Sequence, residues 1–190
     1  MIIRQVVNSI FNSCSYVISH GDGSWLVDCG DLDLILPCVD GRVEGVLLTH
    51  GHFDHIFGLN NLLSLFPTIP IYTNQAGKNA LFSDKLNFSK YHEESFILDS
   101  ERNVALISDG DIVQLGPGLK ANAVFTPGHS PDCVSWIVGD ALFTGDSFIP
   151  GVKTVTTFPL SNKALAARSE NLIREMATHR TVYPGHAILD

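Results

Sequence analysis

Short apolar runs separated by turn signals dominate the first part of the chain. The runs at 2–8 (IIRQVVN), 15–20 (SYVISH) and 24–30 (SWLVDCG) contain many β-branched and aromatic residues, which favours strands. The sequence HGDG at 20–23 separates the last two runs and predicts a hairpin. A fourth run, VEGVLLTH at 43–50, is apolar enough for a buried strand. The chain is therefore expected to begin as an antiparallel sheet.

Helical spacing appears in four other segments. Apolar residues recur at intervals of three or four over 53–66, which predicts one helix that stops before Pro67. Shorter helices are expected at 31–41, where Gly41 would end the helix, and at 75–83. The strongest helical pattern lies at 161–179, with Ser161 as the expected N-cap and four apolar residues: Leu165, Leu172, Ile173 and Met176.

Further strands are predicted along the rest of the chain, where Asp-Gly and Gly-Pro turns separate apolar runs. These runs lie at 69–74, 103–107, 111–116, 119–125, 133–138, 141–146 and 181–186. Strands followed by helices, twice over, predict an α+β fold in which two sheets pack together with helices outside. No change of composition divides the chain, so a single domain over 1–190 is expected. The polar, turn-rich residues 84–103 are expected to form part of a substrate rim.

Charge and composition narrow the expected partners. The formal charge is -8 and the Lys and Arg residues form no cluster, which argues against a nucleic-acid surface. Apolar runs are too short for a membrane span, and the N-terminus shows no signal-peptide pattern. The 4 cysteines include no Cys-x-x-Cys pair, as is typical of reduced thiols. A cytoplasmic protein that acts on a small molecule is expected, and its oligomeric state is left open.

Metal-ligating side chains follow the predicted strands. Residues 49–55, THGHFDH, contain His50, His52, Asp54 and His55, and three Gly-preceded residues follow later strands: His129, Asp146 and His186. Side chains at i and i+2 of an extended segment point to the same side, so His50 and His52 can share one ion. Asp54 and His55 lie at the turn into a helix and can reach a second ion. Imidazole and carboxylate ligands suit zinc, with iron or manganese as alternatives.

These motifs resemble those of the metallo-β-lactamase-fold hydrolases. The resemblance rests on THGHFDH, TPGHS around His129, FTGDS around Asp146, YPGH around His186 and LVDCG around Asp28, and so spans nearly the whole chain. It implies a four-layer αββα sandwich, with two mixed β-sheets flanked by helices and a site at one edge of the sheets. It also implies a first metal bound by His50, His52 and His129, a second bound by Asp54, His55 and His186, and Asp146 bridging both.

The complete ligand set predicts two divalent metal ions and therefore a hydrolase. The segments at 126–136 and 141–148 look most like the glyoxalase-II-type branch, hydroxyacylglutathione hydrolases, which implies cleavage of a thioester by a metal-bridging hydroxide. Asp54 is expected to act in catalysis by orienting the nucleophile. Three alternatives stay open: a mononuclear iron oxidoreductase similar to persulfide dioxygenases, a hydrolase of another ester, lactone or lactam, and a relative that binds metal without catalysis.

Other residues are candidates for supporting roles. Lys153 is expected to pair with a substrate carboxylate, or else to be an exposed lysine. Asp28 is expected to orient a ligating histidine, or else to cap a turn. Tyr91 and His92 are expected on a rim without direct contact with the pocket. Cys133 is expected to be a core residue. Glyoxalase II proteins carry a C-terminal helical region that binds glutathione, so the thiol part of the substrate is left open.

Overall fold

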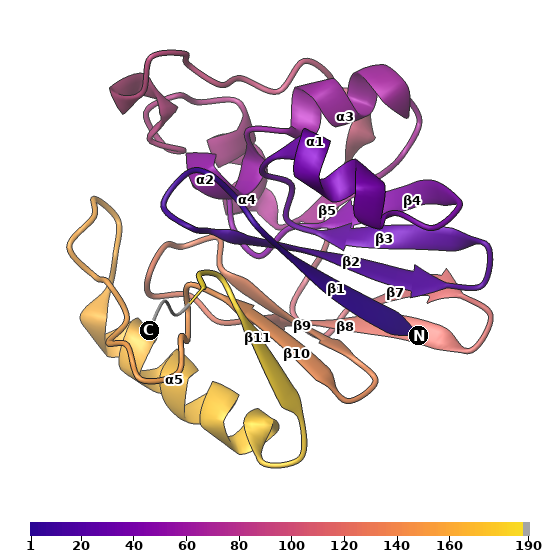
Figure 1. The fold of residues 1–190 in the computed structure, drawn as a ribbon. Helices are drawn as coiled ribbons and strands as arrows, with labels where there is room; N and C mark the ends of the chain where they lie inside the picture. Colours follow the sequence, from indigo (N-terminus) through magenta and orange to yellow (C-terminus); the bar gives the residue numbers. More distant parts are fainter. Residues whose placement is uncertain (188–190) are drawn as a thin grey trace.

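The computed structural model describes residues 1–187 and contains two mixed β-sheets that face each other (Figure 1). The first sheet has the strand order β1-β2-β3-β4-β5-β6: β1 (Ile2–Val7), β2 (Cys14–His20), β3 (Gly23–Val27), β4 (Arg42–Leu47), β5 (Ile71–Thr73) and β6 (Val104–Leu106). The second has the order β11-β10-β9-β8-β7: β7 (Ile112–Gly116), β8 (Leu119–Phe125), β9 (Val134–Val138), β10 (Ala141–Gly145) and β11 (Thr181–Pro184).

Helices cover the outer face of each sheet (Figure 1). Those beside the first sheet are α1 (Leu32–Ile35), η1 (Leu36–Cys38), α2 (Phe53–Ile56), α3 (Leu59–Leu65), α4 (Gln75–Leu81), η2 (Ser89–Tyr91) and η3 (Glu101–Asn103). The longest helix, α5 (Lys163–Ala177), covers the second sheet. The predicted α+β class and αββα sandwich are therefore confirmed. Among residues 1–187, no helix combines the length and the apolar composition needed to cross a bilayer.

Three apolar clusters fill the three interfaces between these layers. The strand β2 shows how one sequence serves two of them: Tyr16 and Ile18 join the cluster between the sheets, whereas Val17 joins the cluster under α1 and α3. This division follows the alternation of side chains along a strand. A smaller cluster, which includes Leu142 and Ile173, packs α5 against the second sheet.

Buried polar groups of three aromatic residues connect the two sheets. Trp136 Nε1 donates a hydrogen bond to the Leu48 carbonyl (2.9 Å), and Trp25 Nε1 donates to the Leu115 carbonyl (2.9 Å). The Tyr16 hydroxyl donates to the Pro184 carbonyl (2.6 Å). Because a buried donor without a partner is costly, these bonds favour one relative position of the sheets and hence of the loops at their edge.

The single helix predicted over 53–66 is wrong, because the structure divides it into α2 and α3 at Gly58. The Gly58 amide donates a hydrogen bond to the Cys29 carbonyl (3.0 Å). A Cβ at this position would also collide with the Gly30 carbonyl oxygen. This close approach of two backbones turns the chain and separates α2, which carries Asp54 and His55, from α3.

Helix α5 begins one residue later than expected. Its N-cap is Asn162, whose Oδ1 accepts hydrogen bonds from the Ala164 and Leu165 amides (3.0 Å each), so the assignment of Ser161 is wrong. The Ser161 hydroxyl instead donates to the His129 carbonyl.

The buried face of α5 also differs from the apolar set that the sequence suggested. Ala166, Ser169 and Ile173 are its buried residues, and Met176 packs against the same cluster. Leu165 and Leu172 are exposed.

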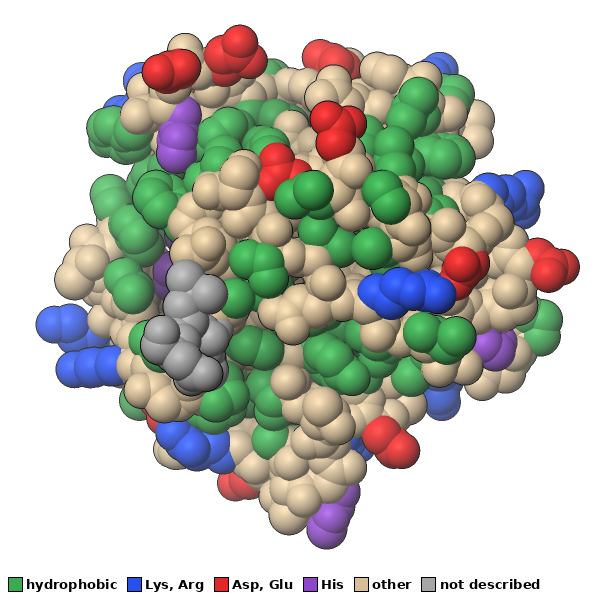
Figure 2. All heavy atoms as spheres, viewed as in Figure 1, with side chains coloured by type: hydrophobic (Ala, Val, Ile, Leu, Met, Phe, Trp, Pro, Cys, Tyr) green, Lys and Arg blue, Asp and Glu red, His purple; other side chains and the backbone are tan. Residues whose placement is uncertain are grey.

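Charged side chains are interspersed with apolar ones over the face shown in Figure 2. Acidic side chains gather toward the top of this view, and the basic ones are mostly spread over its edges, so no continuous basic surface forms on that face among the described residues. The absence of a nucleic-acid partner stays a prediction.

We expect Asn162→Ala to lower the free energy of unfolding by about 1 kcal/mol, because two amides at the start of α5 lose their acceptor. Urea denaturation measures this change. The matched control is Lys163→Ala, at an exposed position of the same turn, where a change below about 0.5 kcal/mol is expected. Equal effects of the two substitutions would contradict the capping role.

Candidate metal centre

The seven ligand-type residues converge at one edge of the sandwich, because each follows the end of a strand or lies in the helix next to it. The segment after β4 supplies four of them, and the segments after β8, β10 and β11 supply one each: His50, His52, Asp54 and His55, then His129, Asp146 and His186. Strand ends fix the backbone on both sides of the site, so the side chains meet although they are far apart in the sequence.

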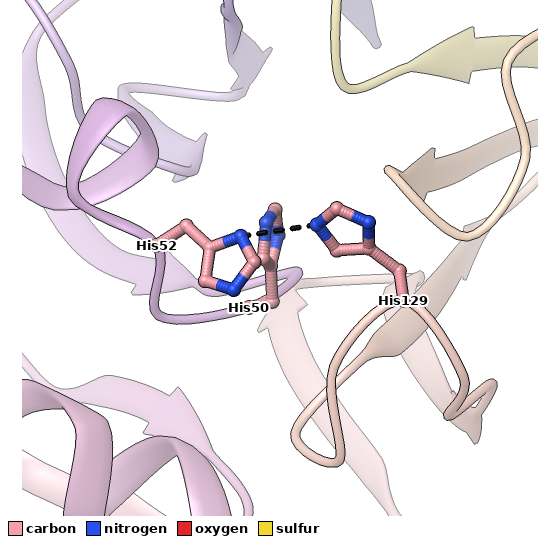
Figure 3. Close-up of side chains that lie close together, drawn as sticks. All are labelled: His50, His52 and His129. Atoms are coloured by element: carbon pink, nitrogen blue, oxygen red, sulfur yellow. Dashed lines mark hydrogen bonds between the residues drawn. The ribbon is translucent and has the colours of Figure 1, made fainter. Parts of the chain in front are cut away.

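Three overlapping groups of side chains could each hold a metal ion. They are His50, His52 and His129; His50, His55 and Asp146; and Asp54, His55 and His186. Within each group the ligand atoms lie within 4.8 Å of one another. Figure 3 shows the first group, in which His52 Nδ1 lies 3.0 Å from His129 Nε2. The structure therefore brings together all seven residues that the sequence singled out.

Asp146 lies between the two ends of this cluster. Its Oδ2 is 3.5 Å from His129 Nε2 and 3.2 Å from His186 Nε2, and its Oδ1 is 3.6 Å from His55 Nε2. Asp54 Oδ2 lies 3.4 Å from the Nε2 atoms of both His55 and His186. One carboxylate thus faces histidines of both end groups, as a bridging ligand must.

Within residues 1–187, several buried polar atoms of the cluster have no hydrogen-bond partner, as is expected of side chains that bind a metal ion. His50 Nε2, His55 Nε2 and Asp146 Oδ1 are buried and have no hydrogen-bond partner among the described residues. Such an atom costs about 1–3 kcal/mol when nothing satisfies it. The three residues that carry these atoms form one of the candidate groups, so a shared cation would satisfy them together. The nitrogen and oxygen donor set fits divalent metal ions such as zinc, iron or manganese.

For four of the five ligand histidines, all except His52, the Nδ1 atom is anchored outside the cluster. His129 Nδ1 donates to the Val155 carbonyl and His186 Nδ1 to the Phe11 carbonyl, both at 2.9 Å. His50 Nδ1 lies 3.1 Å from the Thr49 hydroxyl. Because these Nδ1 atoms carry the proton, the Nε2 lone pairs point into the site, which is the form that binds a metal.

Asp28 anchors His55 in the same way. Its Oδ2 lies 3.0 Å from His55 Nδ1, and its two oxygens accept hydrogen bonds from the Thr49 amide and hydroxyl (2.7 Å each). The backbone of Asp28 has a φ of 57°, a left-handed conformation that residues other than glycine rarely adopt. The structure thus places Asp28 against a ligand-type histidine, where the sequence suggested it.

Asp132 is a supporting residue that the sequence analysis missed. Its buried carboxylate accepts a hydrogen bond from the Gly51 amide (2.6 Å) and fixes the turn between His50 and His52. Burial raises the pKa of Asp132. Its place three residues after His129 was the only available signal, and nothing in the sequence indicated contact with Gly51.

The β1–β2 loop holds the end of β11 in place. Besides the bond from His186 to the Phe11 carbonyl, the Cys14 amide donates to the Gly185 carbonyl (2.7 Å). The Ser13 hydroxyl donates to the Asp54 carbonyl (2.6 Å). One loop therefore positions ligand-type residues from two distant segments.

Burial and neighbouring charges shift the pKa values of the ligand histidines in opposite directions. Burial, reinforced by His129, lowers the pKa of His52 to about 3. Burial also lowers the pKa of His50 well below its ordinary value. For His55 burial acts in the same direction, but the carboxylates of Asp54 and Asp28 outweigh it and raise the pKa to about 10. His50 and His52 are therefore neutral at pH 7 and can donate a lone pair to a metal.

A cavity of about 580 Å³ opens beside the ligand cluster, which forms part of its lining. Tyr91 and His92 also line it, so the expectation that they lie outside the pocket is wrong. The sequence analysis did not single out the other lining residues, which come from several loops: Phe11, Phe53, Asn87, Phe88, Val155, Phe158 and Pro159.

Lys153 is exposed and is not among the described residues that line this cavity. The chain turns at 149–152, where Ile149 and Val152 form a β-bridge and Gly151 has a φ of 78°. The residues beyond that turn, Val155 and Phe158, reach the cavity. The structure therefore favours the interpretation of Lys153 as an exposed lysine.

Comparison with known proteins places this arrangement in a family. The family model described as Metallo-beta-lactamase superfamily matches residues 10–186. The chain belongs to this superfamily. Proteins that it resembles include "Probable metallo-hydrolase YqgX" of Bacillus subtilis (strain 168), which is 31% identical over 144 residues that cover 74% of this chain and 67% of that protein.

Two other relatives of this chain have names that specify an activity. A "Hydroxyacylglutathione hydrolase" of Xylella fastidiosa (strain 9a5c) is 32% identical over 59% of this chain and 37% of that protein. An "Atrochrysone carboxyl ACP thioesterase" of Aspergillus fumigatus is 32% identical over 76% of this chain and 38% of that protein. The matched segments span less than half of both relatives.

Solved structures of other proteins share the fold. The B3 metallo-beta-lactamase BLEG-1 superposes with a TM-score of 0.89 over 100% of this chain and 93% of that one, at 24% identity, which shows the fold alone. ETHE1 from Myxococcus xanthus superposes with a TM-score of 0.77 over 99% of this chain and 76% of that one, at 25% identity.

Asp28→Asn is expected to lower zinc affinity by about 10- to 100-fold, because an amide holds the Thr49 and His55 donors less well than a carboxylate. Competition with a chromophoric chelator measures the affinity, and circular dichroism verifies folding. Asp33→Asn, at an exposed position of α1, is the matched control and should leave the affinity unchanged. Equal affinities of the two folded variants would argue against this role of Asp28.

Proposed function

We propose that this superfamily member is a di-metal-dependent hydrolase that cleaves thioesters. The observation that carries the proposal is the ligand cluster beside a cavity, in which three buried ligand atoms lack partners that metal ions would supply. The names of two relatives, a hydroxyacylglutathione hydrolase and an acyl-carrier-protein thioesterase, support a thioester as the substrate class. A small molecule that enters the cavity is the expected partner.

The proposed ligand sets follow the geometry of the cluster. One ion would be held by His50, His52 and His129, and the other by Asp54, His55 and His186. Asp146 would bridge the two ions, since its carboxylate faces histidines of both sets. Zinc is the expected metal, with iron or manganese as alternatives that fit the same donors.

The proposed reaction adds water across the thioester bond and yields a carboxylate, a thiol and a proton. Bound divalent ions would lower the pKa of water toward neutrality and polarise the carbonyl. Asp54 would accept a hydrogen bond from the attacking water and orient it, as its carboxylate lines the cavity. A thiol with a pKa of about 8.5 leaves as thiolate without a strong general acid.

His52→Ala should reduce thiol release from an acyl thioester by on the order of a hundredfold or more, because loss of a ligand removes several kcal/mol of transition-state stabilisation. A chelator should do the same, and added zinc should restore the rate. Free thiol is measured with a colorimetric reagent. The control is His179→Ala, an exposed histidine beyond α5, which should retain full activity. No thiol release from a panel of thioesters at full metal loading would remove the proposal.

A second candidate is a mononuclear iron oxidoreductase of the persulfide dioxygenase type. The structural similarity to ETHE1 supports keeping this candidate. The two candidates differ in metal content and in oxygen consumption. Two zinc ions per chain with thiol release would support the hydrolase, whereas one iron per chain with oxygen uptake on a persulfide would support the oxidoreductase. Elemental analysis of protein purified without added metal, combined with an oxygen electrode, separates them.

A further inference from the structure

Aromatic side chains from four separate segments surround the cavity. They come from the β1–β2 loop, α2, the segment between α4 and η3, and the segment between β10 and α5: Phe11, Phe53, Phe88, Tyr91 and Phe158. Three of these residues are largely exposed, with 68% for Phe11, 73% for Tyr91 and 39% for Phe158. Exposed aromatic rings gathered around a pocket with a few convergent polar groups are typical of a ligand-binding site.

Two of the rings form an apolar wall directly beside the ligand cluster. The centroids of the Phe88 and Phe158 rings lie 5.2 Å apart. Phe88 is 4.9 Å and Phe158 is 5.4 Å from the His52 ring, and Phe158 is also 5.5 Å from the His129 ring. A substrate whose carbonyl approaches these histidines would therefore place its adjoining chain against the two phenyl rings.

The described lining of the cavity offers no cationic side chain to an anionic ligand arm. Among the described lining residues there is no lysine or arginine, and the two carboxylates there, Asp54 and Asp146, are proposed metal ligands. Lys90 lies next to Tyr91, but its Nζ is positioned over the Tyr91 ring, 4.7 Å from the centroid, and does not line the cavity. A glutathione thioester carries two carboxylates, which would find no cationic side chain in this pocket.

The backbone adopts unusual conformations at two of the aromatic residues. Phe11 has a φ of 52° and Phe88 a φ of 66°. Bulky side chains rarely adopt this left-handed conformation, and such strained residues concentrate at functional sites. The strain at Phe11 and Phe88 is thus stored in the two loops that bring aromatic rings to the cavity.

We propose that the cavity selects thioesters with an uncharged, apolar acyl group, and that Phe88 and Phe158 are the residues that determine this specificity. The inference rests on the proposed thioester hydrolysis and names its substrate class. The acyl chain would pack against the apolar wall, and glutathione would not be preferred over other thiols.

Substrate series test the assignment. Thioesters of N-acetylcysteamine with acetyl, butanoyl, hexanoyl and octanoyl groups should show kcat/KM values that rise about three- to fourfold with each added methylene, until the wall is covered. Butanoyl-glutathione should react no faster than butanoyl-N-acetylcysteamine. Acetyl thioesters of ethanethiol, butanethiol and hexanethiol should differ by less than threefold.

Variants test the two phenylalanines. Phe88→Ala and Phe158→Ala should each lower kcat/KM for the octanoyl thioester at least tenfold and reduce its advantage over the acetyl thioester. The matched control is Leu65→Ala, an exposed apolar residue at the end of α3, which should preserve that advantage. Calorimetric binding of S-octyl-N-acetylcysteamine, a non-hydrolysable thioether, to metal-free protein gives a readout independent of activity and should weaken about tenfold in the Phe88 and Phe158 variants.

The outcomes separate this inference from the proposed function. Three outcomes would overturn the apolar-acyl specificity while thioester hydrolysis stands. They are a tenfold preference for the glutathione thioester, rates that follow the length of the thiol, and equal binding of S-ethyl- and S-octyl-N-acetylcysteamine. Absence of thiol release from every thioester, together with thioether binding that strengthens with chain length, would overturn the proposed hydrolysis and support an apolar pocket.

Discussion

The close approach of seven imidazole and carboxylate groups is the interaction on which the rest of the structure depends. Buried ligand atoms such as His50 Nε2 and Asp146 Oδ1 lack partners, so the polypeptide alone holds them together at a cost in free energy. The apolar cluster between the sheets and the buried tryptophan hydrogen bonds offset this cost and keep the strand ends in position. A bound cation would relieve the same cost, so the rigid sandwich prepares the site for the proposed metal ions.

The surroundings of the cluster divide into a polar support and an apolar entrance. Asp28 and Asp132 accept hydrogen bonds behind the ligand-type residues and fix their backbone and rings. On the open side, phenyl rings replace such partners. A bound molecule would therefore meet polar side chains mainly at the ligand cluster, and the rest of it would contact mainly apolar rings.

Local patterns in the sequence were sufficient for most of the fold. Strand alternation and turn residues predicted the two sheets, and the motif at 49–55 drew attention to residues that the structure brings together with His129, Asp146 and His186. The failures depend on contacts between distant segments. The break at Gly58 arises from the Gly30 backbone, and the role of Asp132 from Gly51, neither of which local periodicity can reveal. The rim expected at 84–103 does contain Phe88, but no pattern around Phe11 indicated that it would reach the same cavity.

The hydrogen bonds between the β1–β2 loop and the residues after β11 affect the order in which the site assembles during folding. His186 is the last of the seven residues along the sequence, and its ring donates a hydrogen bond to the carbonyl of Phe11, which precedes all seven. A contact between residues so far apart in sequence contributes to a high contact order, which slows folding. Before residues 181–186 are synthesised, the emerging chain can bring together His50, His52 and His129, but not all seven ligand-type residues. The complete set of seven ligand-type side chains is therefore expected to form only when β11 docks beside β10.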